Sequence, residues 1–314
     1  MNLGHFILGI SLLLGQNTLF AVIEPSEINA NLVPEIKIGI VIEQSAAGSI
    51  SAETKEYFKV LDRFIYHEDS LFHVVPVPLN AFISERGYSN GHPEKKEILS
   101  HLVQKDLRGL SGVIIPGDDF NFPPFRISDD PLAEVMRYSG QKQIHDEETI
   151  YGMTAREFYR RNPDHLLNPH GDSLVYEGML ISLVYASPLP MLTACHGTLM
   201  YGYMNQARFV AGIEGHADHN VVKVKLRPDS KISHLLGEFD NLTLHYHTVA
   251  ISLNGLPNHL IASGWDHNLV EILEDKNYPA YLGFQGHPEL SPDHPAINLF
   301  VKQVLDNYLR HTHA

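Results

Sequence analysis

The chain contains a single cysteine, Cys195, and its neighbours are those of a nucleophile. The apolar residues 189–194 before it predict a strand, and residues 196–202 after it predict the start of a helix. A thiol at such a turn faces the positive end of a helix, where N–H groups favour the reactive thiolate. A lone cysteine after an apolar strand is more often buried and inert, so a catalytic role for Cys195 requires a partner.

Residues 281–289 offer that partner, because a strand-like run there ends in His287, Pro288 and Glu289. Pro288 favours extended backbone at His287, and side chains two positions apart on an extended chain project to the same side. Glu289 can therefore orient the imidazole while His287 takes the proton of Cys195. With 20 histidines in the chain, a His-x-Glu pair alone is more often a surface pair. Combined with the cysteine turn, it predicts a Cys195–His287–Glu289 triad.

The elements that would position these residues alternate between strand and helix. Residues 36–42 are short and rich in β-branched side chains, which is typical of a buried parallel strand. Residues 51–66 carry large apolar side chains at the spacing of one helical face. Further strands are predicted at 73–77, 110–115 and 189–194, and further helices at 94–107 and 173–186. This order predicts an α/β fold with a mainly parallel sheet and right-handed crossovers.

The segment from Phe120 to Gly171 interrupts this alternation. It is rich in Pro, Asn, Asp and Arg, and only residues 153–159 show a short helical pattern. Such a length exceeds that of an ordinary connection, so we interpret the segment as a cover over a site.

Composition bounds the class of protein. A chain of 314 residues with 44% hydrophobic and 19% charged residues can form one large α/β domain, which we place at residues 36–314. The net charge of -14, without a block of lysines or arginines, argues against a nucleic-acid partner and favours a small-molecule or peptide substrate. A single cysteine excludes an intramolecular disulfide and the paired-cysteine zinc sites.

The amino-terminal 21 residues predict a signal peptide. An apolar run at residues 6–14 is followed by polar residues and by Ala21, a small residue at the expected cleavage point. The alternative is a buried first helix or strand. With residues 22–35 as a linker, we expect an exported protein, periplasmic or secreted, that has no contact with a membrane after processing. No later stretch approaches the roughly 20 apolar residues of a spanning helix.

These motifs resemble the class I glutamine amidotransferase-like superfamily, and within it the gamma-glutamyl hydrolase and gamma-glutamyl-GABA hydrolase group. The motifs stand in that family's order over most of residues 36–309: Pro116-Gly117 after a strand, Cys195-x-Gly197, Trp265-Asp266 before an acidic strand, and Gln285-x-His287-Pro288-Glu289. The resemblance implies a three-layer, flavodoxin-like sandwich with a cysteine nucleophile elbow. It also implies a thioester on Cys195, hydrolysed by water that His287 activates. The oxyanion hole would come from the backbone N–H groups of His196 and Asp118.

Three positions depart from the pattern of that family. Thr193 stands where a glycine usually precedes the cysteine by two residues, and Asp118 stands where a second glycine usually follows Pro-Gly. Leu199 occupies a position at which Gln or Glu often helps to hold the glutamyl substrate. These departures put glutamine itself in doubt as the substrate.

The histidines between residues 216 and 247 raise the question of a metal, since neutral imidazole is a common ligand. None of them has the helical HExxH spacing, and His245-Tyr246-His247 fits a strand with both rings on one face. In the resembling family the corresponding segment lines the substrate pocket. We therefore interpret His245 and His247 as substrate-binding residues and expect neither a metal nor a cofactor.

The function that these observations favour is hydrolysis of a gamma-glutamyl or similar side-chain amide by a cysteine-dependent enzyme. Two alternatives stay open, because a fold alone does not fix a substrate. One is an inactive binding protein of the same fold, and the other is a cysteine hydrolase of a different amide or ester. No synthase domain is recognisable, so an ammonia-channelling partner is not expected.

Overall fold

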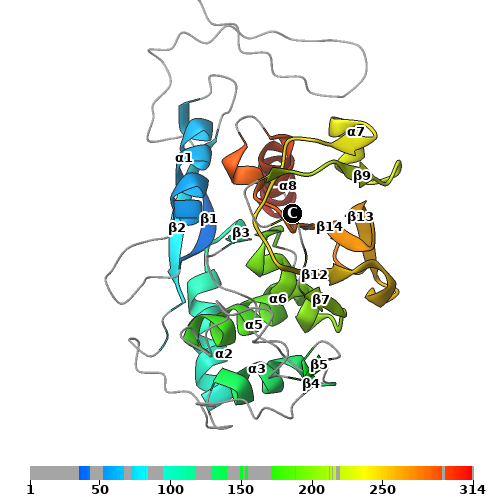
Figure 1. Ribbon diagram of the computed structural model, residues 1–314. Helices are drawn as coiled ribbons and strands as arrows, with labels where there is room; N and C mark the ends of the chain where they lie inside the picture. Colours follow the sequence, from blue (N-terminus) through cyan, green and yellow to red (C-terminus); the bar gives the residue numbers. More distant parts are fainter. Residues whose placement is uncertain are drawn as a thin grey trace, which may run out of the picture.

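The computed structural model describes residues 35–42, 52–66, 72–81, 83, 95–117, 129–139, 149–150, 153–154, 171–187, 189–211, 213, 215–216, 220–291 and 294–312 (Figure 1). The expected signal peptide and, up to Glu35, the linker lie outside these residues, as do Asp118 and most of the expected cover. Across the described ranges, no helix combines the length and the apolarity that a membrane crossing requires.

One mixed sheet forms the middle layer. Its parallel half runs in the order β2, β1, β3, β6, β15, and its antiparallel half continues from β15 through β14, β13 and β9 to β10. The parallel strands are β1 (Glu35–Ile42), β2 (His73–Asn80), β3 (Gly112–Ile115), β6 (Met191–Ala194) and β15 (Tyr281–Phe284). The antiparallel strands are β7 (Phe209–Ala211), β9 (Val224–Leu226), β10 (Phe239–Asp240), β12 (Val249–Ser252), β13 (Leu260–Asp266) and β14 (Leu269–Asp275). β12 joins the sheet by pairing with β14, and β7 pairs with β12.

Helices cover both faces of the parallel half, as strand alternation requires. Val113 and Ile115 of β3 belong to one buried cluster and Ile114 to the other, because successive side chains point to opposite faces. The first face packs against α2 (Lys95–Leu107), α3 (Pro131–Ser139), α5 (Gly171–Tyr185) and α6 (His196–Met204). The second packs against α1 (Ala52–Tyr66) and α8 (Pro295–Thr312). In Figure 1 the first group of helices lies in the lower half of the view and α8 in the upper half. The three-layer, flavodoxin-like α/β prediction is confirmed.

Short elements complete the described chain. They are the strand pairs β4 (Thr149–Ile150) with β5 (Met153–Thr154) and β8 (Asn220–Val221) with β11 (Leu244–His245), the helix α7 (Ser233–Leu236), and the 3-10 turns η4 (Leu253–Gly255) and η5 (Pro288–Leu290).

The expected cover contains elements that the sequence reading missed. Residues 153–154 form a strand, so the helical pattern proposed to begin there is wrong at its first residues. Within the described residues of this segment, the helix is α3, which begins at Pro131. The Asp130 carboxylate accepts a hydrogen bond from the Ala133 N–H at 3.0 Å. An acceptor before the helix followed by proline at the first helical position is a strong start signal.

Candidate active site

Cys195 occupies the turn between β6 and α6, and its backbone is strained. Its φ of 43° and ψ of -109° lie outside the regions that L-residues normally adopt. The Cys195 N–H donates to the Phe284 carbonyl at 2.8 Å, and its own carbonyl accepts from the Leu199 N–H at 3.1 Å. Because neighbours on both sides fix the turn, the strain of about 1–3 kcal/mol is held in place. This is the geometry of a nucleophile elbow.

Gly197 explains how α6 can start so close to the sheet. A Cβ at this position would come within 2.5 Å of the Ile115 carbonyl oxygen on β3. Only glycine therefore lets the first turn of α6 pack against the end of β3, where the chain leaves the sheet. The Cys-x-Gly motif in the sequence has this steric cause.

His287 and Glu289 form a buried pair across from the elbow. Glu289 Oε1 lies 2.8 Å from His287 Nδ1, and both residues are about 3% exposed. The His287 N–H donates to the Leu244 carbonyl at 2.7 Å, which anchors the loop after β15. Glu289 belongs to the 3-10 turn η5, so it approaches the imidazole through that turn and not along an extended chain as the sequence suggested. Since Nδ1 is engaged, Nε2 is the ring nitrogen left for Cys195.

Gly117 brings Cys195 and His287 together. A Cβ on Gly117 would lie 2.4 Å from His287 Cε1 and 2.8 Å from Cys195 Cβ, so both side chains close around the bare glycine. Burial alone would lower the pKa of His287. The charge of Glu289 and the adjacent Cys195 sulfur, with hydrogen bonds to both, outweigh burial and raise that pKa well above its ordinary value. The imidazole is therefore poised to carry a proton beside the sulfur.

Tyr57 also belongs to the site. The sequence predicted this residue only as part of the apolar face of a helix. It comes from α1, is fully buried and lies near both Glu289 and Cys195. Burial raises the pKa of Tyr57 well above its ordinary value, and the nearby charge of Glu289 raises it further. The phenol therefore stays protonated and can donate toward the carboxylate that orients His287.

Thr193, where the resembling family has glycine, is accommodated within a hydroxyl network. Its Oγ1 lies 2.8 Å from Thr198 Oγ1 and 2.9 Å from the Tyr281 hydroxyl. Gly283 faces Thr193 across the strand pair, and a Cβ on Gly283 would approach Thr193 Oγ1 to 2.9 Å. The space that Thr193 needs is thus supplied by a glycine on the neighbouring strand.

Two further departures from the family pattern were Leu199 and Asp118, and the expected oxyanion-hole residues were His196 and Asp118. The structure describes Leu199 and His196 but not Asp118. Leu199 is buried in the core on the first face of the sheet. The His196 side chain points into the protein, where Nε2 lies 3.1 Å from Glu177 Oε2 of α5. The spacing of these residues in the sequence gave no indication of this interaction. The backbone of His196 forms the first residue of α6, where N–H groups point out of the helix end. Asp118 lies outside the described residues.

His245 and His247 stand on either side of Tyr246, which itself borders the cysteine. Cys195 Sγ donates to the Tyr246 carbonyl oxygen at 3.7 Å. The two imidazoles are buried and turn toward Glu271: His245 Nδ1 and His247 Nε2 lie 3.1 and 3.4 Å from Glu271 Oε2. The Tyr246 backbone therefore lies beside the thiol. The imidazoles of His245 and His247, which were expected to bind substrate, lie behind it.

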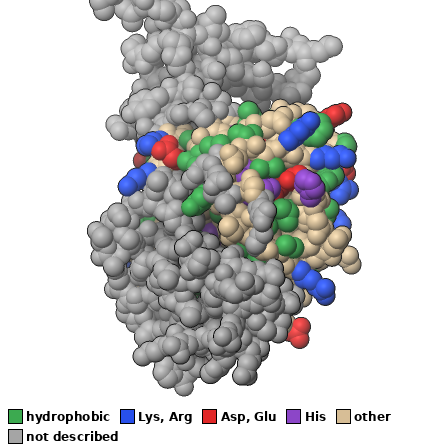
Figure 2. All heavy atoms as spheres, viewed as in Figure 1, with side chains coloured by type: hydrophobic (Ala, Val, Ile, Leu, Met, Phe, Trp, Pro, Cys, Tyr) green, Lys and Arg blue, Asp and Glu red, His purple; other side chains and the backbone are tan. Residues whose placement is uncertain are grey.

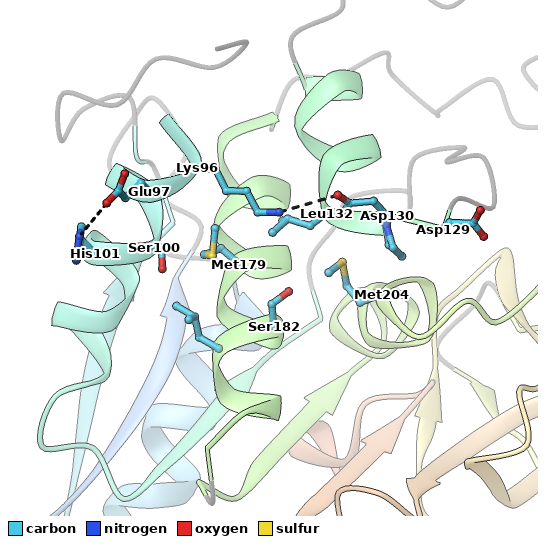
Figure 3. A pocket seen from close by; sticks show the side chains of 12 residues that line it. Lys96, Glu97, Ser100, His101, Asp129, Asp130, Leu132, Met179, Ser182 and Met204 are labelled. Atoms are coloured by element: carbon cyan, nitrogen blue, oxygen red, sulfur yellow. Dashed lines mark ion pairs between the residues drawn. The ribbon is translucent and has the colours of Figure 1, made fainter. Parts of the chain in front are cut away.

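Two described pockets lie away from this chemistry. The larger, of about 820 Å³, is lined by α2, α3, α5 and α6 residues such as Lys96, Leu132 and Met179 (Figure 3). The second, of about 620 Å³, is lined by residues that include Tyr185 and His259. Neither lining includes a residue of the Cys195–His287–Glu289 group. On the face shown in Figure 2, the described Lys and Arg side chains are scattered and form no continuous patch.

This arrangement is suited to acyl transfer. It offers a thiol on a strained turn at a helix start, an imidazole beside it, and a carboxylate on the far ring nitrogen. A group that attacks, a group that moves a proton and N–H groups that receive negative charge are the parts such a reaction requires.

Comparison with known proteins places the fold. No protein-family model matches the sequence, and no curated protein matches it. Among solved structures, the glutaminase domain of Trypanosoma brucei CTP synthase with bound acivicin is similar, with a TM-score of 0.52 at 10% identity, over 86% of this chain and 94% of that one. A GMP synthase component from Thermoplasma acidophilum is also similar, with a TM-score of 0.50 at 16% identity, over 89% of this chain and 98% of that one. The chain therefore shares its flavodoxin-like α/β fold with glutamine amidotransferase-like structures.

Proposed function

We propose that the protein is a cysteine-dependent hydrolase of a gamma-glutamyl or similar side-chain amide. Cys195 is the nucleophile, His287 moves the proton and Glu289 holds the imidazole. The observation that carries the proposal is the strained φ of 43° at Cys195, opposite the 2.8 Å His287–Glu289 pair. Strain of this kind persists where a reaction requires the geometry. The solved glutaminase domain of similar fold supports the same class of bond.

In the first half of the reaction, the Cys195 thiolate attacks the amide carbon and the carbonyl π electrons move to oxygen. Backbone N–H groups at the start of α6, with His196 as its first residue, stabilise that oxyanion. The tetrahedral intermediate then collapses, the C–N bond breaks, and His287 gives its proton to the leaving amine. The acyl group stays on sulfur as a thioester.

In the second half, His287 accepts a proton from a water molecule, and the resulting hydroxide attacks the thioester carbon. Collapse breaks the C–S bond, releases the carboxylic acid and returns the thiolate beside a protonated imidazole. The Glu289 carboxylate stabilises the imidazolium in both halves. The buried phenol of Tyr57 lies near the same carboxylate.

A panel of amides tests this proposal. The purified protein would be incubated with glutamine, gamma-glutamyl anilides and gamma-glutamyl peptides, with the matching alpha-glutamyl compounds as controls. We expect release of the amine from gamma-linked compounds only, and none from Cys195→Ser. Acid quenching during turnover should trap an acyl adduct on Cys195, visible as a mass increase. Turnover that survives in Cys195→Ser would reject the nucleophile, whereas binding of the panel without any turnover would favour the binding-protein alternative.

A further inference from the structure

Four buried side chains from distant segments meet behind Tyr246. His216 comes from the loop after β7, His245 from β11, His247 from the residues that follow, and Glu271 from β14. One potential ligand atom from each lies within 4.8 Å of all the others, and all four side chains are buried. This cluster is separate from Cys195, His287 and Glu289 and plays no part in the proposed reaction.

The spacing of the cluster is that of a tetrahedral metal site. His247 Nε2 lies 3.2 Å from His216 Nδ1 and 3.3 Å from His245 Nδ1. The Glu271 carboxylate lies 3.4 Å from His216, 3.1 Å from His245 and 3.4 Å from His247. Zinc bonds of about 2.0–2.1 Å to nitrogen place tetrahedral ligands about 3.3–3.4 Å apart. With Oε2 as the Glu271 ligand atom, four of the six separations are thus 3.1–3.4 Å, close to the spacing that one zinc ion would impose, and the four ligand atoms all lie within 4.8 Å of one another.

Hydrogen bonding alone leaves this cluster incomplete. Among the described residues, neither carboxylate oxygen of Glu271 has a partner in hydrogen-bond geometry, although both are buried. His245 Nε2 and His247 Nδ1, on the outer sides of their rings, also lack a partner among the described residues. Buried polar atoms without partners are costly, and native proteins rarely keep several together. A cation at the centre would satisfy the carboxylate and the three inward-facing ring nitrogens at once.

Asp266 supplies the outer support that metal-binding histidines require. Its Oδ2 lies 3.3 Å from His216 Nε2, so this nitrogen carries the ring proton and donates it to the carboxylate. The Nδ1 lone pair of His216 then faces the cluster. A carboxylate behind a ligating imidazole fixes its tautomer and orientation in metal sites.

We propose that His216, His245, His247 and Glu271 bind one zinc ion in a closed tetrahedral site. Four protein ligands leave no open position, which is the mark of a structural site. The ion would fasten the Tyr246 segment to β14, and the Tyr246 carbonyl lies 3.7 Å from Cys195 Sγ. The Glu271 carbonyl also accepts the Gln285 N–H at 2.7 Å, two residues before His287. Zinc therefore holds together the Tyr246 segment, which contacts Cys195, and β14, which contacts the chain just before His287.

Metal binding by the full chain tests the site without any substrate. Protein stripped with a chelator would be titrated with Zn²⁺ in the presence of a competing chromophoric chelator, and stoichiometry would be read by native mass spectrometry. Co²⁺ would replace Zn²⁺ for visible spectroscopy, since tetrahedral Co²⁺ absorbs far more strongly than octahedral Co²⁺. We expect one ion per chain, a tetrahedral spectrum and a higher unfolding temperature with zinc.

Three variants locate the ion. Glu271→Gln should weaken zinc binding more than 100-fold, and Asp266→Asn should weaken it about 10–100-fold because it removes only the outer support. His234→Ala, which removes an exposed histidine, should bind as the wild type does. Absence of stoichiometric zinc in folded wild-type protein, an octahedral Co²⁺ spectrum, or unchanged affinity in folded Glu271→Gln would overturn the proposal. If Glu271→Gln does not fold, the wild-type spectrum and Asp266→Asn decide. None of these readouts depends on amide hydrolysis.

Discussion

Gly117→Ala should separate the histidine from the nucleophile by a steric overlap that can be estimated. The added Cβ would lie 2.4 Å from His287 Cε1, whereas carbon atoms pack at about 3.5 Å or more. The overlap is thus about 1 Å, and the same Cβ would lie 2.8 Å from Cys195 Cβ. Backbone strain adds nothing, because Gly117 is not among the positive-φ glycines. The pair with Glu289 at 2.8 Å holds His287, and the strained turn holds Cys195. We expect the imidazole to be pushed away from the sulfur.

A misplacement of about 1 Å lowers the rate of a positioned reaction about 100-fold, and overpacking costs about 1–3 kcal/mol of stability. The assay is the rate at which iodoacetamide labels Cys195, followed by mass spectrometry, together with urea unfolding. Turnover of the amide that proves to be the substrate gives a second readout. Labelling needs no known substrate, so it tests the geometry by itself.

Gly178→Ala is the matched control, because it makes the same chemical change within α5. Its Cβ would meet only flexible side-chain ends of Leu132 and Met200, at 3.3 Å. Labelling of Cys195 should be unchanged, and stability should rise by up to about 1 kcal/mol, as glycine is unfavourable inside a helix. A folded Gly117→Ala protein with wild-type labelling and turnover would refute the close packing of Cys195, His287 and Gly117.

Three further predictions concern protons and hydroxyls. Because the pKa of His287 is raised, its imidazolium should promote Cys195 labelling at pH 6, and His287→Ala should slow labelling there. A labelling rate that rises only above about pH 8 in both proteins would contradict this prediction. Burial alone would raise the pKa of Asp240, but hydrogen bonds from His294 and other neighbours lower it to about 2. The wild type should therefore lose about 2 kcal/mol of unfolding free energy as the pH falls from about 5 to 2, and Asp240→Asn should show a flatter acid limb in urea titrations. Thr193→Val should cost about 1–3 kcal/mol by removing a buried hydroxyl from its network, while Thr193→Ser stays near wild type; equal stability of the two variants would reject the network.

The elements that the sequence predicted well are those whose signal is local. β1 and α1 follow from a short β-branched run and from apolar residues on one helical face. Cys195 and His287 each follow a strand of the parallel half, β6 and β15, which are neighbours in the sheet. Parallel strands bring their carboxyl ends to one edge, so residues after two such strands meet there. The nucleophile and its histidine could therefore be proposed before the fold was known.

What the sequence did not reveal depends on pairs of distant segments. From the sequence, Thr193 was a departure from the family pattern, and the glycine that accommodates it, Gly283, is a separate position on another strand. The same holds for the histidine cluster. His216 and Glu271 are remote from His245 in the chain, and His216 is joined to the His245 segment by the His247 N–H, which donates to the His216 carbonyl at 2.9 Å. Local spacing favoured pocket or packing for these rings because it contains no trace of such pairing.

The backbone of Cys195 sets stability against activity in this protein. Glycine adopts a φ of 43° without steric penalty, so Cys195→Gly would release about 1–3 kcal/mol of strain at an entropic cost of about 0.5–1 kcal/mol. The folded state would then be more stable without its only thiol. An engineer who optimised this chain for heat resistance alone would remove the cysteine early and obtain a robust protein with no nucleophile. Residues like this one should be held fixed before any search for stabilising changes begins.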